Sequence, residues 1–197
     1  DGVGPTVSWQ VPAGSYDLSE TNLPGYTAGV FDCDGGTLVG QTVTLAIGES
    51  ATCTVVNDDE PAQLELVKVV VNDDGGTALV SDFTLSAAGP TPITGAGGAS
   101  GAVNAGVYTL SETNVAGYAA GAWSCVGGDL DGDELTLGNG ESAVCTITND
   151  DQPGTLTLIK QVVNDDGGTA TANEFTLTAD GPGTAGIDGV GPTVSGQ

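Results

Sequence analysis

The only two basic residues of the chain, Lys68 and Lys160, occupy matching places in two related segments, LELVKVV and LTLIKQV. Successive side chains of a β-strand point to opposite faces. A strand over 64–72 therefore places Lys68 on the face that carries Leu64 and Leu66. An ammonium group in an apolar core is costly unless something neutralises it, so a partner for each lysine is expected inside the core.

Two further polar groups are expected to face the same core. In a strand over 107–113, Glu112 shares a face with Leu110, and in a strand over 143–149, Asn149 shares a face with Ile147. Burial favours the uncharged forms of an amine and of a carboxylic acid, and a neutral amine is a nucleophile. The three groups can thus form a hydrogen-bonded network or react with one another.

The elements that carry these residues are repeated along the chain. Four landmarks return after the same interval of 92 positions: Glu20 as Glu112, Cys33 as Cys125, Asn57 as Asn149 and Lys68 as Lys160. The ten-residue stretch at Asp1 also returns at Asp188, with Trp9 replaced by Gly196. We expect residues 1–63 to be the C-terminal portion of one module plus a linker, 64–154 a complete module plus a linker, and 155–197 the N-terminal portion of a third.

The composition favours short strands and turns. Gly accounts for 33 residues, and strand-forming Thr and Val are abundant. No segment has a convincing helical period, and strands are expected near 64–72, 81–87, 99–103, 107–113, 118–126, 133–137 and 143–149. Seven short strands in one module predict an all-β, Greek-key sandwich of prealbumin or immunoglobulin type. The chain is then a head-to-tail array of such modules, with a period of about 92 residues.

The charge restricts the partners. Two basic residues face 26 acidic ones, which gives a formal net charge of -24. Such a chain repels nucleic acid and anionic lipid, and no apolar run approaches the ~20 residues of a membrane span. We expect no membrane insertion, and neighbouring copies of the chain as its partners. The chain has no signal peptide and no initiator Met, so a mature or internal segment is expected.

The four cysteines form two pairs, and the members of each pair are 20 residues apart. The chain contains no His and no Cys-x-x-Cys motif, so a zinc site is not expected. Free thiols in the core are one interpretation, and disulfides Cys33–Cys53 and Cys125–Cys145 are the favoured one. Disulfides require an oxidising compartment, which predicts an extracellular, cell-surface location.

The order of the polar residues resembles a known family. The chain is similar to the Cna B-type or SpaA-type modules of bacterial surface pilins and adhesins. The similarity lies in the order of a Lys on the first strand, an L-S-E-T motif in mid-module and an Asn that ends the last strand. The resemblance implies a prealbumin-like sandwich and a Lys–Asn isopeptide bond assisted by the Glu. One set would be Lys68, Glu112 and Asn149. A second, across units, would pair Lys160 with the next unit's counterparts of Glu20 and Asn57.

The three groups could form the implied bond by a known type of reaction. A neutral Lys68 amine would attack the amide carbon of Asn149, and a protonated Glu112 would polarise the carbonyl group and relay protons as ammonia leaves. The alternative is a buried Lys–Glu pair that hydrogen-bonds to Asn without a covalent bond. The reaction would occur once per module, without turnover. The chain has no His from which to build a Cys–His or Ser–His site, so it is not expected to be an enzyme.

Acidic loops raise the question of metal binding, because Ca²⁺ prefers oxygen-rich loops. No cofactor is expected apart from a Ca²⁺ ion held by such loops, although solvated turns would use the same residue types. The candidate ligands are Asp73, Asp74, Asp150, Asp151, Asp129, Asp131 and Asp133.

These features predict a structural repeat of an extracellular bacterial fibre, stalk or pilus-like filament. The alternative is an adhesin module that recognises a protein or a glycan, which would call for an aromatic-lined groove. Aromatic residues make up only 5% of the chain. Two arrangements would complete the terminal portions: a longer polypeptide of which this chain is a part, or separate subunits that complement one another by strand addition.

Overall fold

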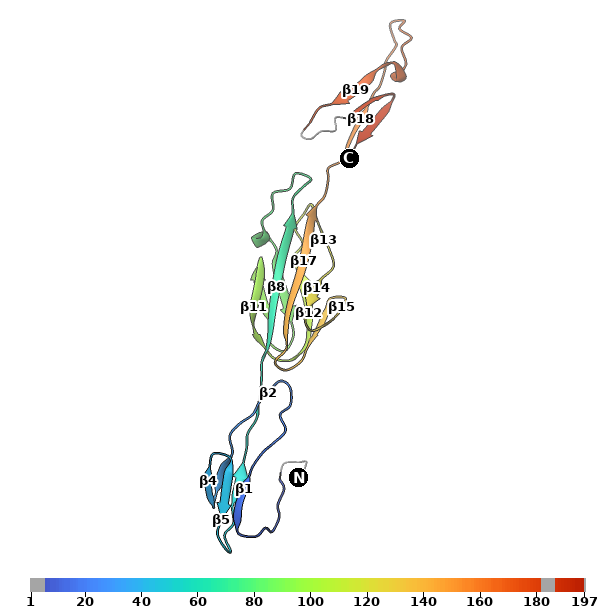
Figure 1. Ribbon diagram of the computed structural model, residues 1–197. Helices are drawn as coiled ribbons and strands as arrows, with labels where there is room; N and C mark the ends of the chain where they lie inside the picture. Colours follow the sequence, from blue (N-terminus) through green and yellow to red (C-terminus); the bar gives the residue numbers. More distant parts are fainter. Residues whose placement is uncertain (1–5, 182–186, 197) are drawn as a thin grey trace.

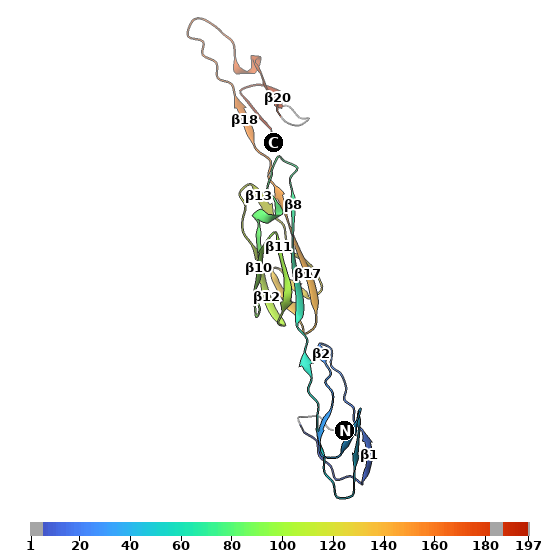
Figure 2. The same ribbon diagram turned by 90° about the vertical axis from the view of Figure 1, so that its left-hand side faces the viewer.

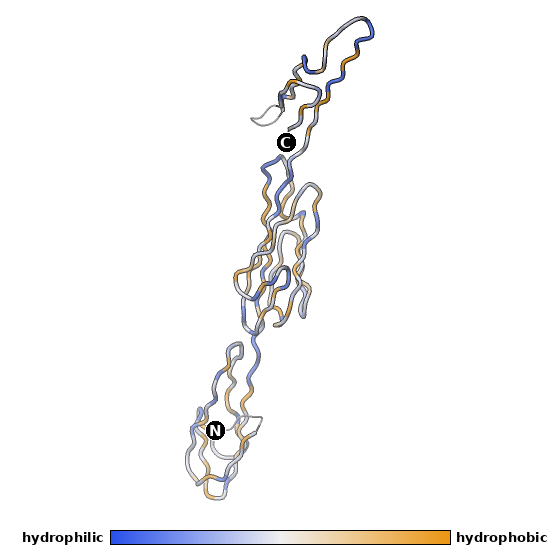
Figure 3. Tube along the Cα trace, turned by 90° about the vertical axis from the view of Figure 1, so that its right-hand side faces the viewer, coloured by the Kyte–Doolittle hydropathy of each residue, from blue (hydrophilic) through white to orange (hydrophobic). Residues whose placement is uncertain are grey.

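The strands form three groups that follow one another along an elongated molecule (Figures 1 and 2). The computed structural model describes residues 6–181 and 187–196. The first five residues of the repeated stretch at Asp1, and Gln197, which ends its second copy, lie outside the described residues. Figure 3 shows that hydrophobic positions recur along the chain in all three groups. The described residues contain no helix that is long and apolar enough to cross a membrane.

The middle group is a sandwich of two sheets. One sheet has the order β10-β9-β12-β16-β15, and the other has the order β11-β8-β17-β13, with β14 also paired to β17. The first and last strands, β8 and β17, run parallel over nine paired residues, Ser142–Asp150 against Gln63–Val71. The strands are β8 (Ala62–Val71), β9 (Thr84–Ala88), β10 (Ile93–Ala96), β11 (Gly98–Val103), β12 (Gly106–Glu112), β13 (Tyr118–Ala120), β14 (Ser124–Val126), β15 (Asp129–Asp131), β16 (Glu134–Leu137) and β17 (Ser142–Asp151).

The core of this sandwich lies between the two sheets and follows the alternation of the sequence. Along β8, the side chains of Leu64, Leu66 and Lys68 are buried, and the residues between them are more exposed. Tyr108 and Leu110 of β12 meet them from the opposite sheet. The predicted all-β sandwich is therefore confirmed, and so is the inward orientation of the first strand's lysine.

The two terminal groups contain fewer strands. The N-terminal group has β1 (Gly14–Asp17), β2 (Tyr26–Thr27), β3 (Asp32–Asp34), β4 (Thr37–Val39), β5 (Thr42–Leu45), β6 (Thr52–Thr54) and β7 (Asp58–Asp59). The C-terminal group has β18 (Leu156–Ile159), β19 (Thr176–Ala179), β20 (Ile187–Val190) and β21 (Thr193–Gly196). Most of their large apolar residues are partly or fully exposed, because neither group closes a sandwich by itself.

Several predicted strands were wrong in detail. The strand expected at 81–87 begins only at Thr84, because the 3₁₀ turn η1 (Val80–Asp82) precedes it. The segment 118–126 is two strands, β13 and β14, because its register against β17 shifts by one residue between the pair Ala120–Asn149 and the pair Ser124–Thr146. The prediction also missed β10 and β15, which are short and lie beside glycine turns.

A pair of glycines moves the chain from one sheet to the other. Gly127 and Gly128 connect β14, which pairs with β17, to β15, which pairs with β16. Both have positive φ angles, 83° and 66°, and a Cβ on Gly127 would lie 2.0 Å from the Ser142 carbonyl oxygen. Only glycine fits such a position without strain, so this crossover depends on Gly127.

Both predicted disulfides are present. Cys33 pairs with Cys53 between β3 and β6, and Cys125 pairs with Cys145 between β14 and β17. In each case the two cysteines lie directly opposite each other in an antiparallel ladder. The second disulfide lies in the packed core, where Cys145 is fully buried.

Removal of the second disulfide should destabilise the complete sandwich. The bond closes a loop whose ends are 20 residues apart, and a loop of this size contributes about 3 kcal/mol in the chain-entropy model. The double variant Cys125→Ala/Cys145→Ala should lose at least this much unfolding free energy in urea denaturation. The matched control, Cys33→Ala/Cys53→Ala, should leave the transition of the complete sandwich in place. Equal midpoints for the two double variants would contradict the assignment.

Candidate functional site: a buried lysine cluster

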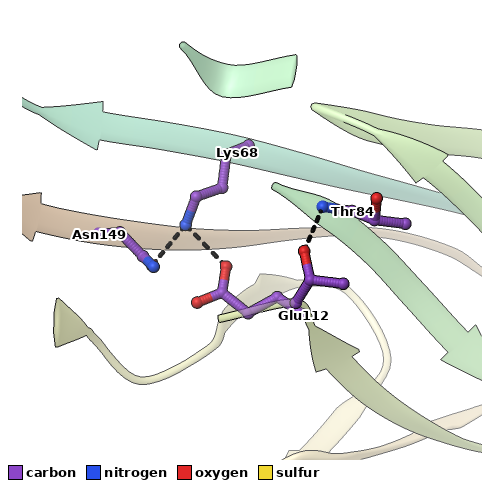
Figure 4. A network of polar contacts seen from close by, with 5 residues as sticks. Lys68, Thr84, Glu112 and Asn149 are labelled. Atoms are coloured by element: carbon purple, nitrogen blue, oxygen red, sulfur yellow. Dashed lines mark hydrogen bonds and ion pairs between the residues drawn. The ribbon is translucent and has the colours of Figure 1, made fainter. Parts of the chain in front are cut away.

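Three strands bring Lys68, Glu112 and Asn149 together inside the complete sandwich. Lys68 lies on β8 and Asn149 lies on β17, its parallel neighbour, whereas Glu112 ends β12 in the opposite sheet. The cluster thus joins the two layers of the sandwich at one point (Figure 4).

The lysine amine makes two polar contacts and no contact with solvent. Lys68 Nζ donates to Glu112 Oε2 at 2.8 Å and also donates to Asn149 Oδ1. The Lys68 side chain has 0% relative exposure, and that of Glu112 has 9%. Within the described residues, every buried side-chain nitrogen and oxygen has a hydrogen-bond partner. The three groups therefore satisfy one another.

An aromatic ring covers the amine from the remaining side. Lys68 Nζ lies 4.5 Å from the centroid of the Phe83 ring, which is fully buried and packs edge-on against Tyr118. A cation over a ring face is stabilised by the ring quadrupole, and the ring also excludes water. Phe83 was not among the predicted site residues, although its return as Phe175, 92 positions later, is the same signal that the lysines give.

The end of β12 is held in place beside the cluster. Thr84 N–H donates to Thr113 Oγ1 at 2.9 Å, as drawn in Figure 4, and Thr113 N–H donates back to the Thr84 carbonyl oxygen at 2.9 Å. Glu112 is also in register with Leu85 of β9. These bonds fix the position of the carboxyl group, so the amine, the carboxyl and the carboxamide meet in a closed and preorganised site.

The chemistry open to this site follows from its three groups. In a dry site, a neutral amine beside a carboxamide can attack its carbon atom, and an adjacent carboxyl group can transfer the protons. If the amine stays charged, the pair is a buried ion pair, and removal of one partner would leave an uncompensated charge.

A second polar cluster lies at the end of the same two strands. The Asp151 carboxylate accepts hydrogen bonds from the backbone N–H groups of Asp73, at 2.8 Å, and of Asp74 and Gly76. Beside it, Tyr118 Oη donates to Asn72 Oδ1 and accepts from Ala78 N–H. We call this arrangement the loop latch, because Asp151 and Tyr118 hold the loop 72–78. Asp151 is among the expected metal ligands, and its role as an acceptor for these backbone N–H groups was not predicted.

The pKa values of the two aspartates at the end of β17, Asp150 and Asp151, are shifted in opposite directions. Loss of hydration alone would raise the pKa of Asp151, but the N–H groups of the 73–76 loop together outweigh it and lower that pKa. Loss of hydration and the neighbouring negative charges, that of Asp73 first, raise the pKa of Asp150. The ionised form of Asp151 is therefore stabilised by folding, whereas that of Asp150 is disfavoured.

Binding of Ca²⁺ by the acidic loops remains a prediction. Carboxylate oxygens of Asp73, Asp150 and Asp151 lie within 4.8 Å of one another, while Asp74 contributes its backbone N–H to the latch. Among the described residues, Asp129, Asp131 and Asp133 form no such group of three. Both Asp151 oxygens already accept N–H bonds, so the latch explains the cluster without an ion.

The other copies of the lysine site are incomplete. Lys160 lies 4.3 Å from the centroid of Phe175, as Lys68 does beside Phe83. Glu20 is exposed, and the half-buried Asn57 accepts a long bond, 3.4 Å, from Gly29 N–H. Lys160 lies in the C-terminal group of strands, whereas Glu20 and Asn57 lie in the N-terminal group. One copy of the chain does not bring them together (Figure 1).

Comparisons with known proteins agree with the fold. The family described as the SpaA-type prealbumin-like fold domain matches residues 1–55, 59–147 and 151–196. Two solved Streptococcus pyogenes structures are also similar. The major pilin protein T3.2 of serotype GAS13637 is 16% identical, with a TM-score of 0.40 over 71% of this chain and 68% of that chain. The major pilin protein T-13 of serotype GAS131465 is 14% identical, with a TM-score of 0.35 over 70% of this chain and 66% of that chain. No curated protein matches the chain.

The loop latch predicts a specific pH dependence. The lowered pKa of Asp151 means that its contribution to stability is present above the unfolded-state value, about 3.9, and is lost as the pH falls through the folded-state value. Asp151→Asn should therefore lower the urea midpoint at neutral pH, and its difference from the wild type should shrink below about pH 4. Hydrogen exchange at the amides of Asp73, Asp74 and Gly76 should become faster in this variant.

Asp150 provides a control, because its contribution to stability changes with pH in the opposite direction. Because folding raises the pKa of Asp150, its contribution to stability is lost as the pH rises through the folded-state value. Asp150→Asn should thus leave the neutral-pH midpoint equal or higher. If both substitutions lower the midpoint equally at every pH, the latch does not have the role assigned to it.

Proposed function

The chain belongs to the SpaA-type prealbumin-like fold domain family, and from this premise we propose that it is a structural segment of an extracellular fibre, stalk or pilus-like filament. The observation that carries the proposal is the enclosed Lys68–Glu112–Asn149 cluster, which links the first and last strands of the complete sandwich. Neighbouring copies, arranged head to tail, are the partners of such a segment.

The path of the chain suits a load-bearing role. The chain enters the sandwich through β8 at one end and leaves it through β17 at the other, and these strands are parallel neighbours. A pull on the two ends would shear the β8–β17 ladder along its whole length. The nine paired residues would then have to separate together, which is the geometry that best resists force.

The joint between the first two groups also favours an extended segment. Gly140 N–H donates to the Glu60 carbonyl oxygen, and Glu60 N–H donates to the Gly25 carbonyl oxygen, both at 2.8 Å. Gln63 N–H donates to the Glu141 carbonyl oxygen, also at 2.8 Å. Pro61 stiffens the linker between these bonds. The joint would therefore hold neighbouring groups in line rather than act as a free hinge.

We further propose that Lys68 and Asn149 become joined by an isopeptide bond. The Lys68 Nζ lone pair attacks Asn149 Cγ, the Nζ–Cγ bond forms and the Cγ–Nδ2 bond breaks. Glu112 transfers a proton from the amine to the departing nitrogen, which leaves as ammonia, and no oxidant or cofactor is needed. The reaction occurs once in each module, so the chain has no turnover activity. A noncovalent Lys–Glu–Asn network is the alternative.

The proposed location is the outer surface of the cell. The two disulfides form and persist in oxidising compartments. The net charge of -24 keeps long assemblies soluble by mutual repulsion. Both properties suit a filament exposed to the medium.

Intact mass measurement tests the covalent bond. The wild-type chain should be lighter than its sequence mass, after allowance for the disulfides, by one ammonia for the complete sandwich. Proteolysis should release a branched peptide that joins Lys68 to Asn149. Glu112→Gln should restore the mass of the unreacted chain, because the proton carrier is gone.

A variant without the amine separates the bond from the fold. Lys68→Met keeps the volume and removes the charge, a change that buried ion pairs often tolerate. It should fold and show no ammonia loss, and its unfolding midpoint should fall below that of the cross-linked wild type. An unmodified mass for the folded wild type would refute the bond and leave the noncovalent network.

A further inference from the structure

The joint between the first two groups is built from two short segments of fixed shape. The turn 23–26 leads into β2 in the N-terminal group, and Figures 1 and 2 place β2 where the two groups meet. The tip 138–141 connects β16 to β17 in the complete sandwich. Each segment is closed by a hydrogen bond of 3.2 Å from the N–H of its fourth residue to the carbonyl oxygen of its first. In both segments the third residue is a glycine.

These glycines let the turn and the tip touch through their backbones. A Cβ on Gly25 would lie 2.5 Å from the Asn139 carbonyl oxygen and 2.7 Å from Asn139 Cβ. A Cβ on Gly140 would lie 3.0 Å from Glu60 Oε2 and 3.3 Å from Gly25 Cα. Gly140 N–H also donates to the Glu60 carbonyl oxygen at 2.8 Å. The contact therefore depends on the absence of side chains at these two positions.

The chain contains a second copy of each segment. The turn 115–118 and the tip 46–49 lie 92 positions from the first copies, and each is closed by the same 3.2 Å bond. Their glycines, Gly117 and Gly48, have φ angles of 85° and 78°, against 76° for Gly25 and 68° for Gly140. A Cβ on either would meet no atom of the described residues within 4 Å. These copies thus have the shape of the joint without its contact.

The tips keep their shape whether or not they are in contact with a turn. In the complete sandwich the Glu141 carboxylate accepts two backbone N–H groups, from Gly138 at 2.8 Å and Gly128 at 3.1 Å. The Glu49 carboxylate accepts the two equivalent N–H groups in the N-terminal group, at 2.8 and 3.2 Å. Each tip is therefore preorganised, and docking would not have to order it.

The turn 115–118 lies at the end of the complete sandwich and lines a hollow of about 500 Å³. Residues 74–78 of the latch loop form its other wall. Gln152 N–H donates to the Gly117 carbonyl oxygen at 2.8 Å, as Glu60 N–H does to that of Gly25. Since the Glu60 carbonyl oxygen accepts the N–H of a docked tip, the Gln152 carbonyl oxygen can accept that of another.

The tip 46–49 carries an apolar side chain at the position that the joint covers. Ile47 is 95% exposed, whereas its counterpart Asn139 is half-buried and lies against Gly25. An apolar side chain gains free energy when it is removed from water. Contact with a turn would cover part of Ile47, so this tip would favour a docked position.

We propose that the turn of one module and the tip of the next form a repeated docking interface, and that the turn 115–118 and the tip 46–49 are two further halves of it. This inference rests on the proposed fibre function and names the surfaces through which its modules meet. The partner of the turn is a β-hairpin tip with glycine as its third residue. The partner of the tip is a turn with glycine as its third residue. In each case the partner belongs to a sandwich of this type that lies next in line.

This interface would fix the direction of one module relative to the next. A linker alone lets two modules rotate about its backbone bonds, and Pro61 removes only part of this freedom, because it fixes a single φ angle. The contact of turn and tip adds a second attachment beside the linker. It thereby restricts the rotation that the linker permits.

Four glycine-to-alanine variants of the full chain test the interface. Gly25→Ala and Gly140→Ala place a Cβ in the contact, whereas Gly117→Ala and Gly48→Ala place one where no described atom lies within 4 Å. All four sites have similar positive φ angles, so the backbone strain of the alanine is similar. Gly25→Ala should raise the hydrogen-exchange rate of the residue 140 amide roughly tenfold, the change expected when one hydrogen bond is lost.

The relative orientation of the two groups is measured by residual dipolar couplings. The wild type, Gly117→Ala and Gly48→Ala should give one common alignment for the N-terminal group and the complete sandwich. Gly25→Ala should give two separate alignments. Gly140→Ala should have a smaller effect in the same direction, because the Glu60 carboxylate can move aside.

The four sites separate docking from local stability. Gly25 and Gly48 lie in the N-terminal group, whereas Gly117 and Gly140 lie in the complete sandwich. Docking predicts that the effect follows the joint, with Gly25 and Gly140 affected. An effect confined to one group, an equal effect at all four sites or no effect at any site would overturn the proposal.

A tandem chain tests the second turn. Residues 62–153 are repeated once within the full chain, which places a tip 138–141 after the first turn 115–118. Gly117→Ala in the first repeat should then broaden the distance distribution in small-angle X-ray scattering, although it has no such effect in the original chain. If the distribution does not change in the tandem chain either, the turn 115–118 is not a docking surface.

The same samples keep this proposal separate from the proposed function. Lys68 is enclosed within the complete sandwich, away from the joint, so the ammonia loss should be equal in the wild type and in Gly25→Ala. Ammonia loss without the expected pattern among the glycine variants would overturn the docking interface alone. The expected pattern without ammonia loss would refute the isopeptide bond and leave the interface in place.

Discussion

The enclosure of the Lys68 ammonium group constrains the whole complete sandwich. A charged or potentially charged group without solvent contact is tolerated only if its partners are held close, and here they come from β8, β12 and β17. A slip of one residue along β8 would turn Lys68 outward, but it would turn Leu64 and Leu66 outward with it. The polar cluster and the apolar pattern therefore enforce the same register.

The parallel pairing of β8 and β17 links this constraint to the elongated shape. Parallel neighbours begin at the same end of a sheet, so a chain that enters on the first strand leaves from the opposite end of the last one. Modules of this kind follow one another in line, as the three groups do in Figure 1. The loop latch of Asp151 and Tyr118 then fastens the loop after β8 to the end of β17. Strand order thus accounts for both the rod and the position of its polar contacts.

Alternation and repetition in the sequence were sufficient to predict most of this arrangement. Lys68, Glu112 and Asn149 each lie on an apolar strand face, and a repeat of 92 residues makes such a pattern visible twice. Strand boundaries were harder to predict, because β10 and β15 are short edge strands of four and three residues, each in a hairpin beside a glycine turn. The latch could not be predicted either, since Asp151 binds backbone N–H groups, which leave no signature in residue type. Phe83 was predictable in principle from its repetition as Phe175.

The two kinds of cross-link would act on different parts of the sandwich. The Cys125–Cys145 disulfide joins β14 to β17, which are antiparallel neighbours close in sequence. It does not connect β8 to anything, so a pull through β8 and β17 would bypass it. A bond between Lys68 and Asn149 would bridge those two strands directly, and it would lie on the direct path of the load from β8 to β17. The disulfide therefore does not make the isopeptide bond redundant. The disulfide restricts the conformations of the unfolded chain, whereas the isopeptide bond would bear the tension.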